Sequence, residues 1–201
     1  MVNTIDGERR RHELSEAVWR LILRDGLGAA SVRGVAQEAG LATGSVRHFF
    51  PTQSDLLVFA MRELSATVTA RVQATSDSHE PAAIIDRAIA IFAELLPLTD
   101  RTQAEFTAYL EFMIRARVDP ALQPVARQTV EDVRGLVITV LTDLQQLRAI
   151  SGAVDPRSEA VRLHALIDGL TVQLLIAPTT LSRKDAHQTL ADSLRALEQH
   201  R

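Results

Sequence analysis

The stretch GLATGSVRHFFPTQSDLL, residues 40–57, contains the local signals that decide the fold. Its first half suits a short helix that carries Arg47 on its polar side. Two phenylalanines follow, and Pro51 ends this helix because proline cannot continue the helical hydrogen-bond pattern. Thr52 then caps a new helix, with Asp55 three residues later in a pattern that resembles a capping box. The stretch predicts a short polar helix between two sharply defined ends.

The residues in front of this helix predict a helix-turn-helix whose turn lies within VAQEAGLATGSV, residues 35–46. Ala36 must be small because the second helix crosses close to it, and Gly40 supplies the positive φ of the turn. Apolar residues at helical spacing predict a helix before the motif and a small core inside it. The residues that carry this prediction are Leu14, Ala17, Val18, Leu21, Ile22, Gly26, Ser31, Val35, Leu41 and Val46.

A recognition helix over residues 43–50 would direct the polar side chains of its first half into the major groove of DNA. Arg47 suits bidentate contact with guanine or a grip on phosphate, and His48 suits a phosphate contact. Phe49 and Phe50 are expected to pack backwards and hold the helix rigid. The other residues expected to contact DNA, or to let the backbone approach it, are Ser31, Arg33, Thr43, Gly44 and Ser45.

Residues 9–60 resemble the DNA-binding domain of the TetR family of bacterial transcriptional regulators. The carrying stretch is GLGAASVRGVAQEAGLATGSVRHFFPTQSDLL, together with the amphipathic helix that ends in Gly26. The family usually has Tyr where this chain has Arg47 and often Lys where it has Gln53, so the resemblance adds Gln53 to the expected DNA contacts. It implies a ligand-responsive regulator, most often a repressor, that binds a palindromic operator as a dimer.

Helical patterns continue through the rest of the chain, so the sequence predicts an all-α protein of about nine helices with no credible strand. Residues 1–51 are expected to form the helix-turn-helix domain, and residues 52–201 a larger ligand-binding and dimerisation domain. The connecting helix is expected over about 52–74. The later helices are expected over 82–96, 101–117, 121–149, 157–177 and 182–198, with a break at TSDSHEP and Pro81 in the next first turn.

Composition excludes several classes of protein. The chain of 201 residues has no cysteine, which rules out disulfides, thiolate metal sites and cysteine nucleophiles. It shows no signal-peptide pattern and no apolar run of the roughly 18 residues that a membrane helix needs, so it reads as soluble and cytoplasmic. The formal net charge is -3, but residues 1–57 hold seven basic and seven acidic residues. A neutral front with clustered arginines can still bind phosphate where those side chains converge.

The end of the chain predicts a dimer. HALIDGLTVQLLIAP, residues 164–178, and the following LSRKDAHQTL resemble the C-terminal domain of BetI-type members of the family. There the last two helices form a four-helix bundle with their copies in a second subunit. Apolar residues wrap more of the helix over 157–177 than one core face needs, and Gly169 permits close approach. The expected interface residues are Leu163, Leu166, Ile167, Leu170, Leu174, Leu190 and Leu194.

The helices between residues 58 and 150 are expected to surround a cavity for a small-molecule effector. Its expected lining is Phe92, Leu95, Phe106, Tyr109, Phe112 and Met113, with the polar groups Glu94, Glu105, His164 and Asp168. Apolar residues at helical spacing belong to an ordinary core more often than to a cavity wall. A buried Glu94 or Glu105 would suit a cationic or hydrogen-bonding ligand.

His164 and Asp168 have a spacing that suits a metal, but no third ligand accompanies them, so neither a metal nor a cofactor is expected. No catalytic triad, phosphate-binding glycine loop or pair of catalytic carboxylates emerges, and an enzyme is not expected. The alternative function is an all-helical carrier or enzyme whose helix-turn-helix has lost its role in DNA binding.

Overall fold

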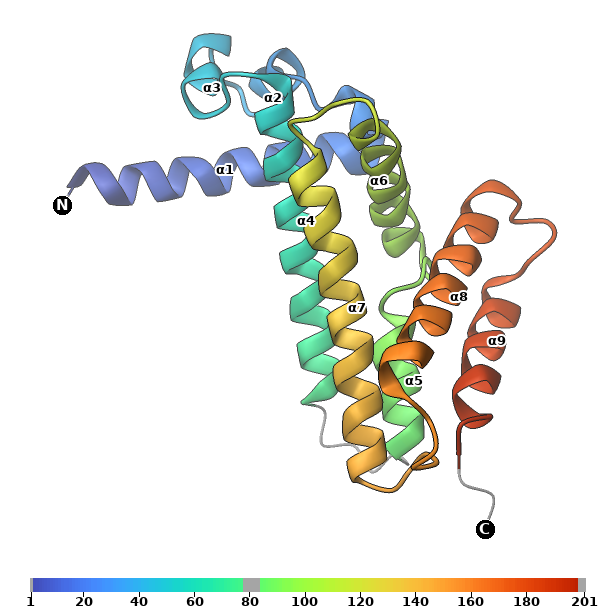
Figure 1. Cartoon of the computed structure of the whole chain (residues 1–201). Helices are drawn as coiled ribbons and strands as arrows, with labels where there is room; N and C mark the ends of the chain where they lie inside the picture. The colour runs from blue at the N-terminus through green and yellow to red at the C-terminus, as the bar shows by residue number, and fades with distance from the viewer. Residues whose placement is uncertain (1, 78–83, 199–201) are drawn as a thin grey trace. The chain divides into compact units, whose positions relative to one another are not determined.

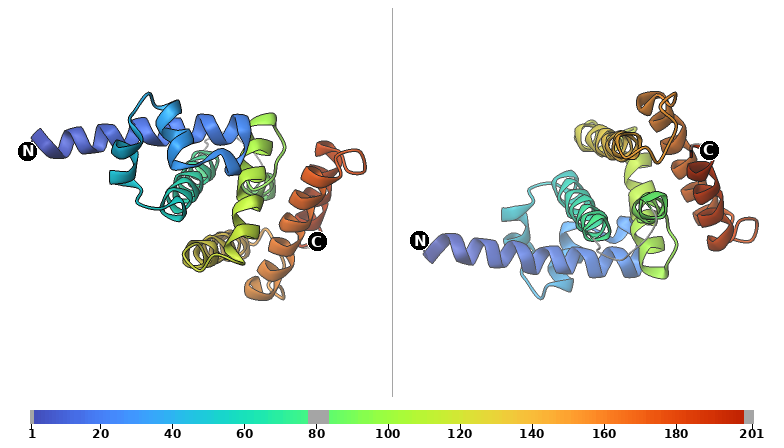
Figure 2. Two further views of the ribbon diagram at one scale, coloured as in Figure 1. Left: turned by 90° about the horizontal axis from the view of Figure 1, so that it is seen from above. Right: turned by 90° about the horizontal axis from the view of Figure 1, so that it is seen from below.

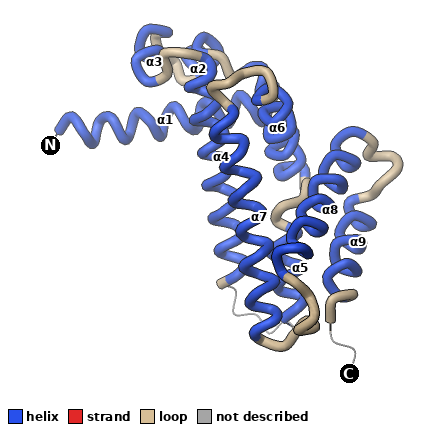
Figure 3. The backbone as a smooth tube through the Cα atoms, in the orientation of Figure 1, coloured by secondary structure: helices blue, strands red, loops and turns tan. Residues whose placement is uncertain are grey.

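The computed structural model describes residues 2–77 and 84–198 (Figure 1). Within these ranges the chain forms nine α-helices and one 3-10 helix, and Figure 3 shows no strand. The prediction of an all-α fold is therefore confirmed, whereas Pro81 lies outside the described residues. The helices are α1 (Val2–Asp25), η1 (Leu27–Ala29), α2 (Val32–Glu38), α3 (Thr43–Phe49), α4 (Gln53–Ser76), α5 (Ile84–Ala93), α6 (Asp100–Ala116), α7 (Gln123–Gln146), α8 (Pro156–Ile176) and α9 (Arg183–Arg195).

The helix starts follow the local signals in the sequence. The Ser31 hydroxyl accepts a hydrogen bond from the backbone N–H of Gly34 and caps α2. At the start of α4, the Asp55 carboxylate accepts from the Thr52 backbone N–H at 3.0 Å, and the Thr52 hydroxyl accepts from the Asp55 N–H at 3.1 Å. This reciprocal pair is the predicted capping box, so α4 begins at a fixed residue directly behind α3.

The chain divides into two compact units. The first contains the residues up to Ala66 together with Thr107–Arg127, and the second contains Thr67–Phe106 and Gln128–Arg201. Helices α4, α6 and α7 therefore contribute residues to both units. The expected domain boundary after residue 51 was placed at the end of the helix-turn-helix motif. The two compact units are instead defined by which residues pack together.

In the first unit, α2 packs against both α1 and α3. Gly40, with a φ of 67°, makes the turn between α2 and α3, as predicted. A Cβ on Gly34 would lie 2.7 Å from the backbone oxygen of Ala29, so only glycine fits at this position of α2. Phe50 is buried with the predicted core, whereas Phe49 is only half-buried. Leu41 is half-buried, and the predicted core residues that are buried are Leu14, Ala17, Val18, Leu21, Ile22, Val35, Ala36 and Val46.

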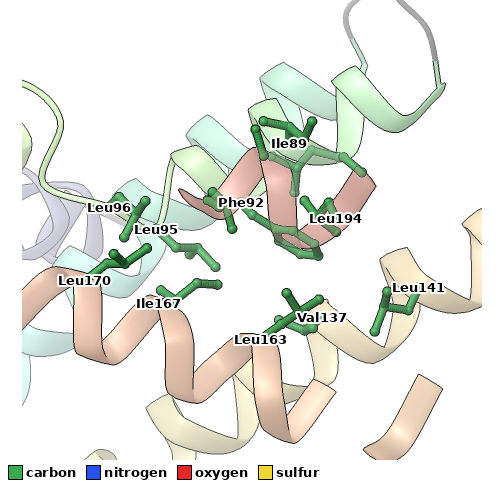
Figure 4. Close-up of a cluster of buried hydrophobic side chains, with 14 of the residues drawn as sticks. Ile89, Phe92, Leu95, Leu96, Val137, Leu141, Leu163, Ile167, Leu170 and Leu194 are labelled. Atoms are coloured by element: carbon green, nitrogen blue, oxygen red, sulfur yellow. The ribbon is translucent and has the colours of Figure 1, made fainter. Parts of the chain in front are cut away.

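The second unit has a continuous apolar core built from α5, α7, α8 and α9 with the end of α4 (Figure 4). Helix α9 packs against α5 and α8, and Figure 2 shows α8 and α9 side by side. Phe92 is completely buried in this core, among leucines and isoleucines of the other helices. None of the helices in the described ranges combines the length and the apolar character required to cross a membrane.

Candidate functional site

Helix α3 presents an exposed polar surface on a buried support. Val46 is completely buried, and Phe50, directly after the helix, is 6% exposed and packs its ring 4.9 Å from that of Phe59. These contacts fix the helix from one side. All the polar residues predicted on α3 are exposed: Thr43, Gly44, Ser45, Arg47 and His48. The arrangement leaves those side chains available to a large partner such as a nucleic acid.

The other three residues predicted to contact DNA lie around the motif. Arg33 is exposed on the first turn of α2. Ser31 is half-buried and already caps α2, which leaves its hydroxyl proton available for a phosphate oxygen. The Gln53 side-chain amide, also half-buried, donates to the backbone oxygen of Ala30 at 3.5 Å. Gln53 therefore also connects the start of α4 to the residue that precedes the α2 cap.

The residues predicted to line one effector cavity are distributed over both units. Tyr109, Phe112 and Met113 belong to the first unit, and the others belong to the second. Phe112 is 1% exposed and borders a space of ≈ 10 Å³ between α1, α4 and α6, which is room for one water molecule rather than an effector. Phe92 is a core residue. The buried aromatic side chains thus pack against protein, because apolar spacing predicts burial without distinguishing a core from a cavity wall.

Two predicted carboxylates meet an arginine that the sequence did not single out. Arg71, on α4, donates from Nε to the Glu94 carboxylate at 3.0 Å and from Nη1 to the Glu105 carboxylate at 2.8 Å. Arg101 donates to the second oxygen of Glu105 at 3.0 Å, and the Thr75 hydroxyl lies 3.4 Å from Glu94. We call these five residues the Arg71 cluster. All lie in the second unit.

Sequence reasoning missed Arg71 because nothing in its spacing separates it from a surface arginine. Its partners are 23 and 34 residues away in the chain, in the turn after α5 and on α6, and only the tertiary fold brings them together. A buried glutamate requires a charged or hydrogen-bonding partner, and that requirement was the one signal that could have prompted a search for an arginine.

His164 and Asp168 form a second polar group, with Arg134 of α7. His164 is 2% exposed, and its Nδ1 accepts a hydrogen bond from Arg134 Nε at 3.1 Å. The imidazole is therefore neutral and carries its proton on Nε2, which lies 3.7 Å from the Asp168 carboxylate. Burial lowers the pKa of His164 from its ordinary value of 6.5, against the opposing effect of Asp168, and burial raises the pKa of Asp168.

Acidification should destabilise the protein through His164. The pKa of His164 is lowered in the folded state, so the unfolded chain binds more protons near pH 6.5. The stability that the protein has above that pH is therefore lost as the pH falls through the lower pKa of the folded state. Urea unfolding followed from neutral pH downwards should show this loss in the parent and a flatter profile in His164→Gln. The exposed His187→Gln on α9 is the control and should keep the parent profile.

Asp168 affects stability with the opposite sign, because its pKa is raised from 3.8 in the folded state and the folded chain therefore binds more protons. Comparing the parent with His164→Gln measures the contribution of the His164–Asp168 pair, since the carboxylate remains in both proteins but loses its histidine neighbour in one. Identical pH profiles of these two proteins would mean that His164 is not held neutral by burial.

The residues predicted for a dimer interface are mostly in the core of the single chain. Leu163, Ile167, Leu170, Leu174, Leu190 and Leu194 are each at most 5% exposed, and Leu166 is half-buried. These buried side chains have almost no surface to offer a second copy. The outward face of α8 instead carries the exposed Val161, Ala165, Val172 and Ile176 and the half-buried Gly169 at helical spacing. We call these five residues the α8 stripe.

The chain is similar to known proteins over nearly its whole length. A family model described as BetI-type transcriptional repressor, C-terminal, matches residues 84–198. The HTH-type transcriptional regulator PksA of Bacillus subtilis (strain 168) is 32% identical over 185 residues, which cover 91% of this chain and 87% of PksA.

Two solved structures have a similar fold. A transcriptional regulator from Rhodococcus sp. Rha1 is 27% identical with a TM-score of 0.77, and the match covers 93% of this chain and 95% of that one. A regulator from Saccharomonospora viridis in complex with choline has a TM-score of 0.81 and covers 96% of this chain and 100% of its own, at 22% identity. The second likeness shows the fold alone.

Proposed function

The chain belongs to the TetR family of transcriptional regulators, with a C-terminal domain of the BetI type, and from this premise we propose that it is a repressor. It binds a palindromic operator as a homodimer, and a small effector releases it. The proteins that it resembles are regulators rather than enzymes. A protein that binds chromosomal DNA acts where the chromosome lies, so we place it in the cytoplasm.

The observation that carries this proposal is the exposed polar surface of α3 on its buried support. In each subunit α3 enters the major groove, where Arg47 and the residues before it face base edges and phosphates. Arg33 and the Ser31 hydroxyl, at the start of α2, contact the DNA backbone beside it. Two such helices read two half-sites that lie about one helical turn apart.

The α8 stripe supports the dimer. Val161, Val172 and Ile176 are 50%, 42% and 71% exposed in the single chain, an unusual exposure for branched apolar residues at matched positions of one helix. A Cβ built on Gly169 meets nothing within 4 Å, so no residue in the described part of the chain requires a glycine there. A second α8 that packs closely against this face would account for both observations.

Helix α6 is the proposed route from effector to DNA. Its first half carries Glu105 in the Arg71 cluster, and its second half belongs to the first unit. There the Glu111 carboxylate accepts a hydrogen bond from the backbone N–H of Leu27 at 2.9 Å, just before α2. Asp119, in the connector after α6, accepts a hydrogen bond from the Ser54 hydroxyl at 2.7 Å, at the start of α4. A displacement of α6 by an effector is thereby passed to the segments that hold α2 and α3.

Selection of bound sequences from a random duplex DNA pool tests the function. We expect an inverted repeat to be enriched, with binding that weakens steeply as salt increases because phosphate contacts release counterions. The enriched duplex then serves as the probe for ligands that release the protein. A pool that shows neither enrichment nor salt-dependent binding would contradict the proposal and favour the alternative, an all-helical carrier or enzyme with an inactive helix-turn-helix.

A further inference from the structure

The Arg71 cluster leaves one buried hydrogen-bond donor without a partner. Arg71 uses Nε for Glu94 and Nη1 for Glu105, whereas Nη2 is buried and makes no hydrogen bond. An unpaired buried donor costs free energy, and the cost is greater when the donor belongs to a charged group. Buried polar groups of folded proteins are nearly always paired, so Nη2 requires an explanation such as a water molecule or a ligand.

The acceptors of the cluster are already in use. Both oxygens of Glu105 are bonded, one by Arg71 and the other by Arg101. Glu94 receives Arg71 on one oxygen and faces the Thr75 hydroxyl with the other. The two arginines and two glutamates also cancel in charge. A cation would therefore find no uncompensated carboxylate here, while an oxygen acceptor would complete the guanidinium.

The surroundings of the cluster are apolar but reachable. Val68 and Val72, on either side of Arg71 along α4, pack with the core of the second unit. The side chains of Arg71 and Glu94 are 20% and 30% exposed, so part of the cluster is in contact with solvent, whereas the Nη2 atom itself is buried. A hydrogen bond made at Nη2 would be strengthened by the low polarity around it.

A second buried polar atom of the same unit is also unpaired. Thr171, on α8, is 5% exposed, and its hydroxyl makes no hydrogen bond. In the described parts of the chain, the buried side-chain polar atoms without a partner are Arg71 Nη2 and Thr171 Oγ1, and both belong to the second unit. The second unit therefore contains polar groups that its own side chains leave unsatisfied.

We propose that Arg71 Nη2 holds the oxygen of a small, largely apolar effector whose polar group is a carbonyl or carboxylate and not a cation. The neutral cluster accepts a carbonyl with no added charge, and a carboxylate gains a charge-assisted hydrogen bond. Glu94 and Glu105 hold the guanidinium in place and do not contact the ligand as counter-ions. Binding is a property of the second unit alone, but its regulatory meaning rests on the function proposed above.

Three probes of one shape and different charge test this class directly. Benzoate, benzamide and benzamidine are anionic, neutral and cationic, and only the first two present an oxygen. At about 10 mM each, benzoate or benzamide should raise the melting temperature by about 3 °C and benzamidine should leave it unchanged. Because this comparison uses the parent protein, it stays decisive even if a variant fails to fold.

The matched variants are Arg71→Lys, which keeps the charge for the two glutamates but lacks the spare planar NH2, and Arg87→Lys on α5. The shift should disappear in the first and persist in the second. A shift with benzamidine alone, a shift that survives Arg71→Lys, or no shift with any probe would each overturn the inference; in the last case Nη2 is served by water. If the protein selects an inverted repeat but fails this ligand test, the proposed function stands and the inference about Arg71 falls. If the probes raise the melting temperature but the protein binds no DNA, the ligand site stands and only its regulatory role falls.

Discussion

Replacing Val172 and Ile176 by aspartate should produce a folded monomer that binds the selected operator at least ~100-fold more weakly than the parent. In the dimer, the second recognition helix binds at a high effective concentration after the first, and the monomer loses that gain. Both side chains are exposed in the single chain, so charges at these positions cost little in the monomer. In a dimer through the α8 stripe, four carboxylates would be buried without partners.

Light scattering after size-exclusion chromatography measures the mass, and fluorescence anisotropy with the selected operator measures the affinity. Val118→Asp, in the connector after α6, is a matched control because Val118 is 83% exposed and lies outside the stripe. It should remain dimeric. A dimeric Val172→Asp, Ile176→Asp protein would show that the interface lies elsewhere.

The substitution Gly169→Leu is an independent test of the same proposed interface. A Cβ at this position meets nothing in the single chain, so the variant should fold with unchanged or slightly raised helix stability. The longer side chain would nevertheless separate two closely packed α8 helices and weaken the dimer. Equal dimerisation of Gly169→Leu and the parent would exclude close packing at the middle of the stripe.

The helix-turn-helix region was predictable because its sequence signals are local. The Ser31 cap, the positive φ of Gly40 and the Thr52–Asp55 capping box each involve residues within a few positions of one another. Such contacts form between neighbours in the chain, so the sequence shows them directly. Phe49 was overestimated as a core residue, because a two-residue aromatic pair cannot show which ring turns inward.

The proposed interface and the proposed effector site were less predictable because they depend on contacts between residues far apart in the chain. A helix that is apolar on most of its surface predicts more than one apolar contact, but not which face meets its own chain. Leu163 and Leu170 are buried in the same core as residues of α5 and α7, while Val172 is left exposed. The Arg71 cluster joins residues from α4, α6 and the turn after α5, and no spacing within one helix indicates it.

Arg47→Ala should weaken binding to the selected operator by roughly 10- to 100-fold while dimerisation and thermal stability stay at the parent level. Arg47 is exposed on α3, and surface substitutions away from structural contacts change stability by no more than about 0.5 kcal/mol. Arg62→Ala is a suitable control because Arg62 is also exposed, lies in the first unit on α4, and has no expected DNA contact. It should bind like the parent.

The salt dependence of the same measurement tells what Arg47 contacts. If the guanidinium grips a phosphate, Arg47→Ala should weaken binding to all duplexes alike and reduce the slope of log K against log salt by about 0.9. If it reads a guanine, the loss should be confined to the operator, and a repeated selection should show relaxed preference at one base pair of each half-site. Bidentate contact with guanine needs two guanidinium nitrogens, so Arg47→Lys should keep a phosphate contact but lose the base preference. Unchanged operator affinity in Arg47→Ala would contradict both roles and move recognition to Thr43 and Ser45.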